Sequence, residues 1–269
     1  MDRNEGFRRM FKGAQLGVDD LLLLEPFQIA YLPGYVPEKE FSAILISKPE
    51  IKRFLVTKCP KITDYINSLL LKFSSSVSPN ELAQYCDTVV WTIADLLVYN
   101  KCPEVYDQLP FHNWDFSEIT SIVNLTNKIV IDGGSGTGRV ALEAANYASV
   151  VYAVEPVARL REFIRSKSNQ RNLTNLFVID GFLNALPFPN NFADCLITSH
   201  ALGWQLPTEL REFERVVKKP GIIIHCPGTA VGVNQEEDDH QVLIKPPWSY
   251  EFSQYEETDG LKRKYWKKL

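Results

Sequence analysis

The sequence of 269 residues predicts a doubly wound α/β domain with a mostly parallel seven-stranded sheet, closed by a C-terminal antiparallel hairpin and preceded by a helix-rich region. Three observations lead to this fold class. After residue 112, apolar strand-like runs alternate with amphipathic helix-like segments. A glycine-rich turn follows the first of these runs. Near the C-terminus, two alternating segments meet at Asp259-Gly260, which is a short-range hairpin signal.

Residues 1–111 read as a helix-rich unit, with one exception. The run "FSAILIS" (residues 41–47) predicts a short strand, whereas "ITDYINSLLLKF" (residues 62–73) places its apolar side chains on one helical face. The stretch "SPNE" is a helix start, because Ser78 can cap the helix, Pro79 suits its first position and Glu81 can complete a capping box.

An apolar stripe follows this helix start. It recurs at three- and four-residue spacing and predicts one helix with a packing face or, alternatively, a face that lines a substrate cavity; its members are Leu82, Cys86, Val89, Ile93 and Leu97.

Residues 112–269 carry the alternating pattern. The predicted strands are residues 128–132, 150–155, 176–180, 195–198 and 221–226, followed by the hairpin. The intervening helices are residues 139–148, 157–168 and 208–217. Several strands are nearly continuous apolar runs, as expected when helices cover both faces of a parallel sheet.

The amino-acid composition disfavours several classes of function. The formal net charge of −4 disfavours binding to nucleic acid. Five scattered cysteines without a CxxC pair indicate buried thiols in a reducing compartment rather than a zinc site or a disulfide framework. We expect a cytoplasmic protein without a secretory signal or a membrane span, because the apolar runs are short.

Two charged runs leave alternatives open. The run "EEDDH" (residues 236–240) is too loosely spaced to predict a metal site, and none is expected. The terminal "LKRKYWKKL" interleaves lysines with Tyr265 and Trp266, so it could meet RNA or an acidic surface. Its simpler interpretation is a solvated edge strand whose charges resist aggregation.

The turn "GGSGTG" lies directly after the first predicted strand. Glycines at 134, 136 and 138 allow positive φ and let the backbone approach a ligand closely. The following helix directs free N–H groups at whatever occupies the turn. The spacing differs from the G-x-G-x-x-G of dinucleotide folds, because residue 139 is Arg. A nicotinamide dinucleotide is therefore disfavoured.

Glu155 ends the second predicted strand, "VVYAVEP". A carboxylate at this position can accept hydrogen bonds from both hydroxyls of a ribose. The alternative is an ordinary solvated glutamate. The glycine turn upstream favours the ribose role.

Three ordered motifs resemble the class I S-adenosylmethionine-dependent methyltransferases, in particular their small-molecule branch. They are "VIDGGSGTGRVALEAA", "VYAVEP" and "ALPFPNNFADCLITSHALGW". The resemblance covers about residues 112–269 and implies a Rossmann-like fold that binds S-adenosylmethionine. Residues 1–111 match no family we recognise and are expected to form a lid that selects the acceptor.

The resemblance implies a set of cofactor-binding residues. Glu155, with Pro156, would hold the ribose, and Asp194 would begin the fourth strand beneath the site. The methionine part would be surrounded by Asp132, Gly133, Gly134, Ser135, Gly136 and Gly138, and the adenine side by Asp180, Gly181, Phe182 and Leu183. Ser199, after the fourth strand, is a further cofactor-binding candidate.

One position departs from the family pattern. Phe182 stands where the family usually has an acid that meets the adenine amine. Either Asp180 takes over this contact, or apolar and backbone groups near Phe182 and Leu183 hold the adenine.

The segment after the fourth strand, "TSHALGWQ", supplies the candidate catalytic residue. His200 could accept a proton near neutral pH or merely hydrogen-bond to a loop. Trp204 is a candidate wall of the acceptor pocket or a core residue. The segment lacks the Asn/Asp-Pro-Pro-aromatic pattern of enzymes that methylate nucleic-acid amino groups, and "HCPG" reverses the proline–cysteine pair of cytosine-ring methylases.

We therefore expect an enzyme that transfers a methyl group to a small or medium-sized acceptor. The alternatives are a non-catalytic, cofactor-binding regulatory or assembly protein and, third, a nicotinamide-dependent oxidoreductase. The sequence does not determine the acceptor atom or the oligomeric state.

Overall fold

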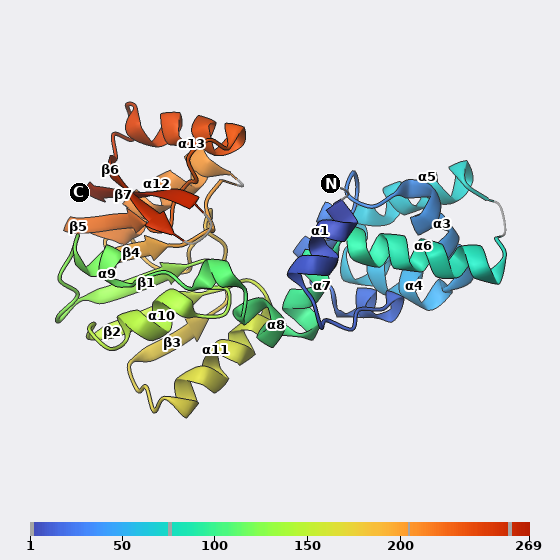
Figure 1. Ribbon diagram of the computed structural model, residues 1–269, viewed down its shortest axis with the longest axis horizontal. Coiled ribbons are helices and arrows are strands. Elements are labelled where there is room, and N and C mark those ends of the chain that lie inside the picture. Colours follow the sequence, from blue (N-terminus) through green and yellow to red (C-terminus); the bar gives the residue numbers. More distant parts are fainter. Residues whose placement is uncertain (1–2, 75–76, 204, 258–259) are drawn as a thin grey trace. The chain divides into compact units, whose positions relative to one another are not determined.

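The chain folds into two compact units, Met1–Leu109 and Pro110–Leu269. The computed structural model describes residues 3–74, 77–203, 205–257 and 260–269. Both units are shown in Figure 1. Each has its own hydrophobic core.

The described part of the N-terminal unit consists of helices joined by short turns. Its core is formed by apolar side chains such as Leu21, Ile29, Phe41, Ile51 and Leu97. The elements are α1 (Arg3–Met10), η1 (Val18–Leu23), α2 (Pro26–Tyr31), α3 (Glu38–Ser47), α4 (Pro49–Lys58), η2 (Pro60–Ile62), α5 (Thr63–Lys72), α6 (Pro79–Thr92), α7 (Ala94–Lys101) and α8 (Pro103–Asp107).

The strand predicted at residues 41–47 is wrong, since this run lies in α3. A short apolar run fits a buried strand and a buried helix equally well. Glu38 and Glu40 in the first turn favour the helix, because they complement its dipole. The Ser42 hydroxyl donates to the carbonyl oxygens of Leu69 and Phe73, so the buried polar residue of the run has hydrogen-bond partners inside the unit.

The predicted start of α6 is confirmed, and its predicted length is not. Ser78 Oγ accepts from the Glu81 amide at 3.3 Å, and Glu81 Oε2 accepts from the Ser78 amide at 3.0 Å, which completes the capping box. The helix ends at Thr92, and α7 begins at Ala94. Ile93, with φ −118° and ψ 26°, leaves helical geometry between them. The apolar stripe therefore spans two helices that share one core.

The C-terminal unit confirms the predicted fold class. Its sheet has the order β3-β2-β1-β4-β5-β7-β6. The pairs among β1 to β5 are parallel, and β7 is antiparallel to both β5 and β6. The strands are β1 (Ile129–Gly133), β2 (Val150–Val154), β3 (Leu176–Ile179), β4 (Ala193–Thr198), β5 (Val217–His225), β6 (Glu251–Glu257) and β7 (Gly260–Lys268).

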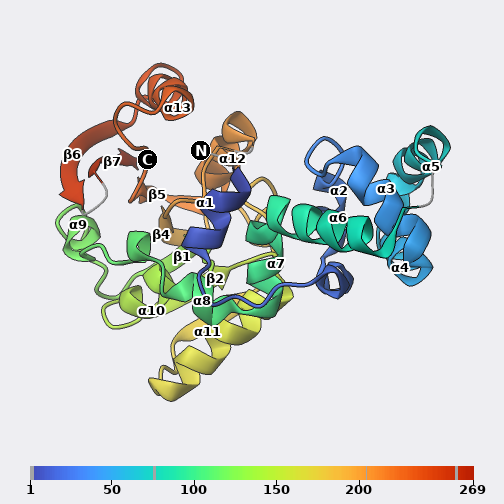
Figure 2. The same ribbon diagram turned by 45° about the vertical axis from the view of Figure 1, so that its right-hand side comes forward.

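Helices cover both faces of this sheet (Figures 1 and 2). Val130 packs in the core on the side of α10 and α11, whereas its neighbour Ile131 packs in the core on the side of α12 and α13. This alternation explains why the central strands are apolar throughout. The helices of the unit are η3 (Pro110–His112), α9 (Ser117–Thr120), α10 (Arg139–Ala144), α11 (Ala158–Gln170), α12 (Leu206–Val216) and α13 (Asn234–Ile244).

The basic C-terminal run does not form a solvated edge, which corrects the sequence-based interpretation. Strand β7 lies between β5 and β6. Three of its cations form ion pairs within the unit: Arg263 with Glu237, Lys264 with Glu118 and Lys267 with Glu214. After β5 the chain passes through α13 to the outer strand β6, and β7 then returns between β5 and β6. The cations of β7 are paired there with acids on α9, α12 and α13. Asp259, in the predicted hairpin turn, lies outside the described residues.

The five cysteines are free thiols, four of them buried and Cys86 half-buried. Burial raises the pKa of Cys195 and of Cys226 to about 12, so neither thiol ionises near neutral pH. Among the described residues, no helix combines the length and the apolar character that crossing a membrane requires.

Candidate functional site at the carboxyl edge of the sheet

The turn between β1 and α10 requires glycine. Gly134, Gly136 and Gly138 have φ values of +69°, +52° and +86°, in the left-handed region that side chains disfavour. A Cβ atom on Gly134 would lie 2.6 Å from Ala201 Cβ, so the turn after β1 and the loop after β4 approach closely. The turn lies where the strand order reverses between β1 and β4, which is where open parallel sheets bind ligands.

Asp132 is a buried carboxyl group that fastens this turn to the following helix. Its Oδ2 atom accepts from the Ala141 amide of α10 at 3.0 Å. The Ser135 hydroxyl donates to the Asp132 carbonyl oxygen at 2.9 Å, which closes the turn. Burial raises the pKa of Asp132 to about 7, although hydrogen bonds with Ser135 and Ala141 oppose the shift.

Glu155 points at the glycine turn from the end of β2. Its Oε2 atom accepts from the Gly136 amide at 2.8 Å, and its Oε1 atom accepts from the Val157 amide at 2.9 Å. The Glu155 carboxylate therefore joins the end of β2 directly to the turn after β1, with no side chain between them. The solvated alternative is wrong, because Glu155 is only 5% exposed. Burial raises the pKa of Glu155 to about 7, although the hydrogen bonds from the two amides and the charge of Arg161 lower it.

Arg161, which sequence reasoning missed, holds the ends of β2 and β3 together. Its Nη1 atom donates to the carbonyl oxygens of Glu155 and Pro156 at 2.8 and 2.7 Å, and it pairs with Asp180 Oδ1 at 3.1 Å. The side chain is largely buried, and Asp180 is exposed. The sequence signal that could have indicated this role is an arginine in the first turn of α11, the helix that follows Glu155 at the end of β2.

The segment after β3 places one apolar side chain, Leu183, against the turn. Leu183 packs over Gly133, since a Cβ atom there would lie 2.8 Å from Leu183 Cδ2. Phe182 is 42% exposed, and its carbonyl oxygen accepts from the Ala185 amide in a tight turn. Gly181 has no room for a side chain, because Pro187 and Val154 lie against it. The carboxylate of this segment, Asp180, is already paired with Arg161.

The loop after β4 carries His200 at the same edge of the sheet. Ser199 is half-buried and His200 is exposed. The His200 backbone has φ +51°, and its amide donates to the Pro227 carbonyl oxygen at 3.2 Å, which ties this loop to the one after β5. The imidazole meets the Phe111 ring edge to face, with ring centroids 5.3 Å apart. Trp204, the candidate acceptor wall, lies outside the described residues.

A second histidine, His225, is buried beneath this loop and was not singled out from the sequence. Its Nδ1 atom shares a hydrogen bond of 2.8 Å with Thr198 Oγ1, which joins the last residues of β4 and β5. Burial lowers the pKa of His225 to about 3, so the ring stays neutral. Of these two histidines, only His200 can exchange a proton with a bound molecule.

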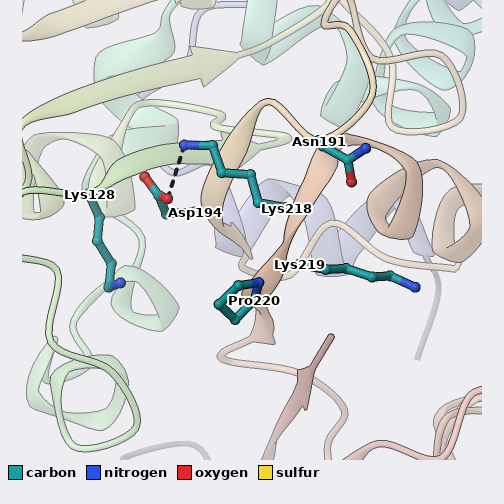
Figure 3. A pocket seen from close by; sticks show the side chains of 6 residues that line it. All are labelled: Lys128, Asn191, Asp194, Lys218, Lys219 and Pro220. Carbon is teal, nitrogen blue, oxygen red and sulfur yellow. Dashed lines mark hydrogen bonds and ion pairs between the residues drawn. The ribbon is translucent and has the colours of Figure 1, made fainter.

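The amino ends of the strands, on the opposite side of the sheet from the glycine turn, carry several charged side chains. A hollow of about 680 Å³ is lined there by Lys128, Asn191, Asp194, Lys218, Lys219 and Pro220. Figure 3 shows Lys218 directed at Asp194, whereas Lys128 and Lys219 extend in different directions. Asp194 accepts from Lys218 Nζ at 3.0 Å and from the Ile129 amide at 2.7 Å, so it fastens the starts of β4, β5 and β1. No cluster of three metal-ligating side chains occurs in the described ranges.

Comparison with known proteins agrees with this architecture. Residues 131–225 match the sequence model of the methyltransferase-domain family, from β1 to the end of β5. The C-terminal unit, which we call the methyltransferase unit, therefore carries a domain similar to those of the class I S-adenosylmethionine-dependent methyltransferases. The family implies that this methyltransferase unit binds S-adenosylmethionine.

Individual relatives of the methyltransferase unit are distant. A protein of Anoxybacillus flavithermus described as an uncharacterized methyltransferase is 24% identical over 110 residues, which are 39% of this chain and 50% of that protein. The chain thus spans about half the length of this curated relative. A SAM-dependent methyltransferase from Aquifex aeolicus superposes with a TM-score of 0.50 at 18% identity, covering 62% of this chain and 96% of that one. For the YcgJ protein of Bacillus subtilis, the TM-score is 0.43 at 18% identity, over 52% and 69% of the two chains.

The two buried carboxyl groups predict how the stability of the methyltransferase unit responds to pH. A carboxyl whose folded-state pKa lies above its unfolded value stabilises the fold at low pH, and this contribution is lost as pH rises through the folded pKa. For Glu155 the window runs from about 4.5 to about 7, and the loss is on the order of a few kcal/mol.

We expect Glu155→Gln to remove this contribution. The melting temperature of the variant relative to the parent should rise between pH 5 and pH 8, measured by calorimetry at matched ionic strength. Asp180→Asn is the control, because Asp180 is exposed and its variant should show no such trend. A pH-independent difference for Glu155→Gln would contradict the raised pKa of the buried Glu155 carboxyl.

Proposed function

We propose that this protein is an enzyme that transfers a methyl group from S-adenosylmethionine to a small or medium-sized acceptor. The observation that carries the proposal is the buried Glu155 carboxylate facing Gly136 across the glycine turn. Each carboxylate oxygen accepts one backbone N–H and keeps a lone pair for a further donor. A ribose diol provides two such donors.

The residues around the turn fit this cofactor. The Thr137 hydroxyl is buried and has no hydrogen-bond partner among the described residues, so the turn holds an unused polar atom. In the proposed assignment, Glu155 with Pro156 holds the ribose. The turn holds the methionine part through Asp132, Gly133, Gly134, Ser135, Gly136 and Gly138, and the adenine side is formed by Asp180, Gly181, Phe182, Leu183 and Ser199.

The adenine contact is proposed to be mainly apolar. Asp180 already forms an ion pair with Arg161, so it is the less favoured partner for the adenine amine. The exposed Phe182 ring and the Leu183 side chain lie on the same segment and supply apolar surface.

The bound cofactor supplies an electrophilic methyl group, so the protein must orient an acceptor and, where the acceptor is acidic, remove its proton. His200 is the proposed proton acceptor, because its ring is exposed at the carboxyl end of β4. The neighbouring His225 stays neutral and buried and takes no part. We further propose that the N-terminal unit selects the acceptor, and that the free thiols reflect a cytoplasmic location.

A second candidate function is a non-catalytic protein that binds the cofactor. Phe182 at the position of the usual adenine-binding acid favours it. Both candidates should bind S-adenosylmethionine, but only the enzyme forms S-adenosylhomocysteine when supplied with an acceptor. Incubation with methyl-labelled cofactor and fractionated metabolites distinguishes them. If the protein binds the cofactor but no fraction yields labelled product, the second candidate is favoured. Thermal stabilisation by NAD and not by S-adenosylmethionine would contradict both candidates.

Gly136→Val should abolish S-adenosylmethionine binding measured by calorimetry. The branched side chain would strain a residue at φ +52° and displace the amide that Glu155 accepts from. Gly13→Val is the matched control, since Gly13 also has positive φ but lies in the N-terminal unit with open space around it. Unchanged affinity in a folded Gly136→Val protein would refute the placement of the site.

His200→Ala should slow turnover by about 10²- to 10⁴-fold if His200 accepts the proton of the acceptor. Cofactor affinity should stay the same, because no proposed cofactor contact is lost. His240→Ala is the control, since His240 of α13 is buried and shares a hydrogen bond with Tyr265 of β7. Equal rates for His200→Ala and the parent would remove His200 from the mechanism.

A further inference from the structure

The segment that leads into the methyltransferase unit, residues 110–115, is held against the site rather than left as a linker. We name it the strap. It begins with the short helix η3 (Pro110–His112) and ends where Asp115 accepts from the Ser117 amide at 2.8 Å, at the start of α9. Trp114 is buried in the core on the side of α10. The chain therefore passes into the sheet domain along a fixed path.

Arg139 fixes this path. It is the first residue of α10, directly after Gly138 of the glycine turn. Its Nε atom donates to the His112 carbonyl oxygen at 3.0 Å, and its Nη2 atom donates to the Trp114 carbonyl oxygen at 2.7 Å. One planar fork thus holds two carbonyl groups of the strap. A lysine at this position would offer a single ammonium group and could not reproduce both bonds in this geometry.

The strap carries an aromatic ring to the proposed proton acceptor. Phe111 precedes His112, whose carbonyl group Arg139 holds, and its ring meets the His200 imidazole at a centroid distance of 5.3 Å and an interplanar angle of 78°. The His200 backbone is anchored separately, through the Pro227 carbonyl oxygen. His200 is therefore held from two sides: its backbone by the Pro227 carbonyl oxygen, and its ring by Phe111 on the strap that Arg139 holds.

We propose that Arg139 is a positioning residue that orients the His200 imidazole through the strap and Phe111. It thereby links the glycine turn to the acceptor side of the site. The mechanistic importance of this link rests on the proposed function of His200. The positional claim itself does not, and it is tested without cofactor or acceptor.

The test is the NMR signal of the His200 ring, which senses the nearby Phe111 ring. The chain has four histidines, and His200→Gln assigns the signal. Phe111→Leu gives the shift that follows loss of the aromatic neighbour. We expect Arg139→Ala and Arg139→Lys to move the His200 signal in the same direction as Phe111→Leu, by a comparable amount for Ala and less for Lys.

Arg171→Ala is the matched control. Arg171 and Arg139 both pair with Glu143, but only Arg139 reaches the strap. The Arg171→Ala variant should leave the His200 signal in place, and an unchanged signal from the buried His225 reports that the unit remains folded. An unmoved His200 signal in a folded Arg139→Ala protein would overturn the proposal. So would an equal shift in Arg171→Ala, since it would show a general effect of weakening α10.

If the positional claim holds, Arg139→Ala should lower turnover and leave S-adenosylmethionine affinity within about two-fold of the parent, because Arg139 contacts the strap. A parallel loss of cofactor affinity would instead assign Arg139 to the glycine turn. These assays fail separately. A shifted His200 signal with normal turnover would remove His200 from the mechanism while leaving the positional role intact.

Discussion

The hydrogen bond between the Glu155 carboxylate and the Gly136 amide is the contact on which the site depends. It joins the end of β2 to the turn after β1, across the point where the strand order reverses. The turn can approach this closely only because Gly134, Gly136 and Gly138 accept left-handed backbone angles. The strand ends, the turn and the start of α10 are thus joined by hydrogen bonds.

This arrangement places two carboxyl groups where burial raises the pKa of each to about 7. Such burial costs stability once the groups ionise, and within the described ranges no lysine or arginine forms an ion pair with either group. Proteins retain such a cost mainly where an ionisable group serves a ligand. A polar diol would lower the cost, because its hydroxyls could donate to the buried Glu155 carboxylate.

Two arginines hold the surroundings of the turn in the same way. Arg161 binds the carbonyl groups that end β2, and Arg139 binds those of the strap. Each begins or lies near the beginning of a helix that follows a strand, and each donates charged N–H groups to backbone carbonyl oxygens. The loops that form the site are therefore fixed by side chains from the helices behind them.

The sequence by itself determined the sheet and the position of the glycine turn, because both depend on local periodicity and on backbone angles that only glycine adopts readily. It did not determine the state of residues 41–47, since a short apolar run suits a buried helix and a buried strand alike. Nor did it show that β7 lies inside the sheet, where its cations meet acids from distant helices. The tertiary structure alone decided which groups Arg139 and Arg161 hold, because a long charged side chain has many possible partners and only the fold brings particular carbonyl groups within its reach.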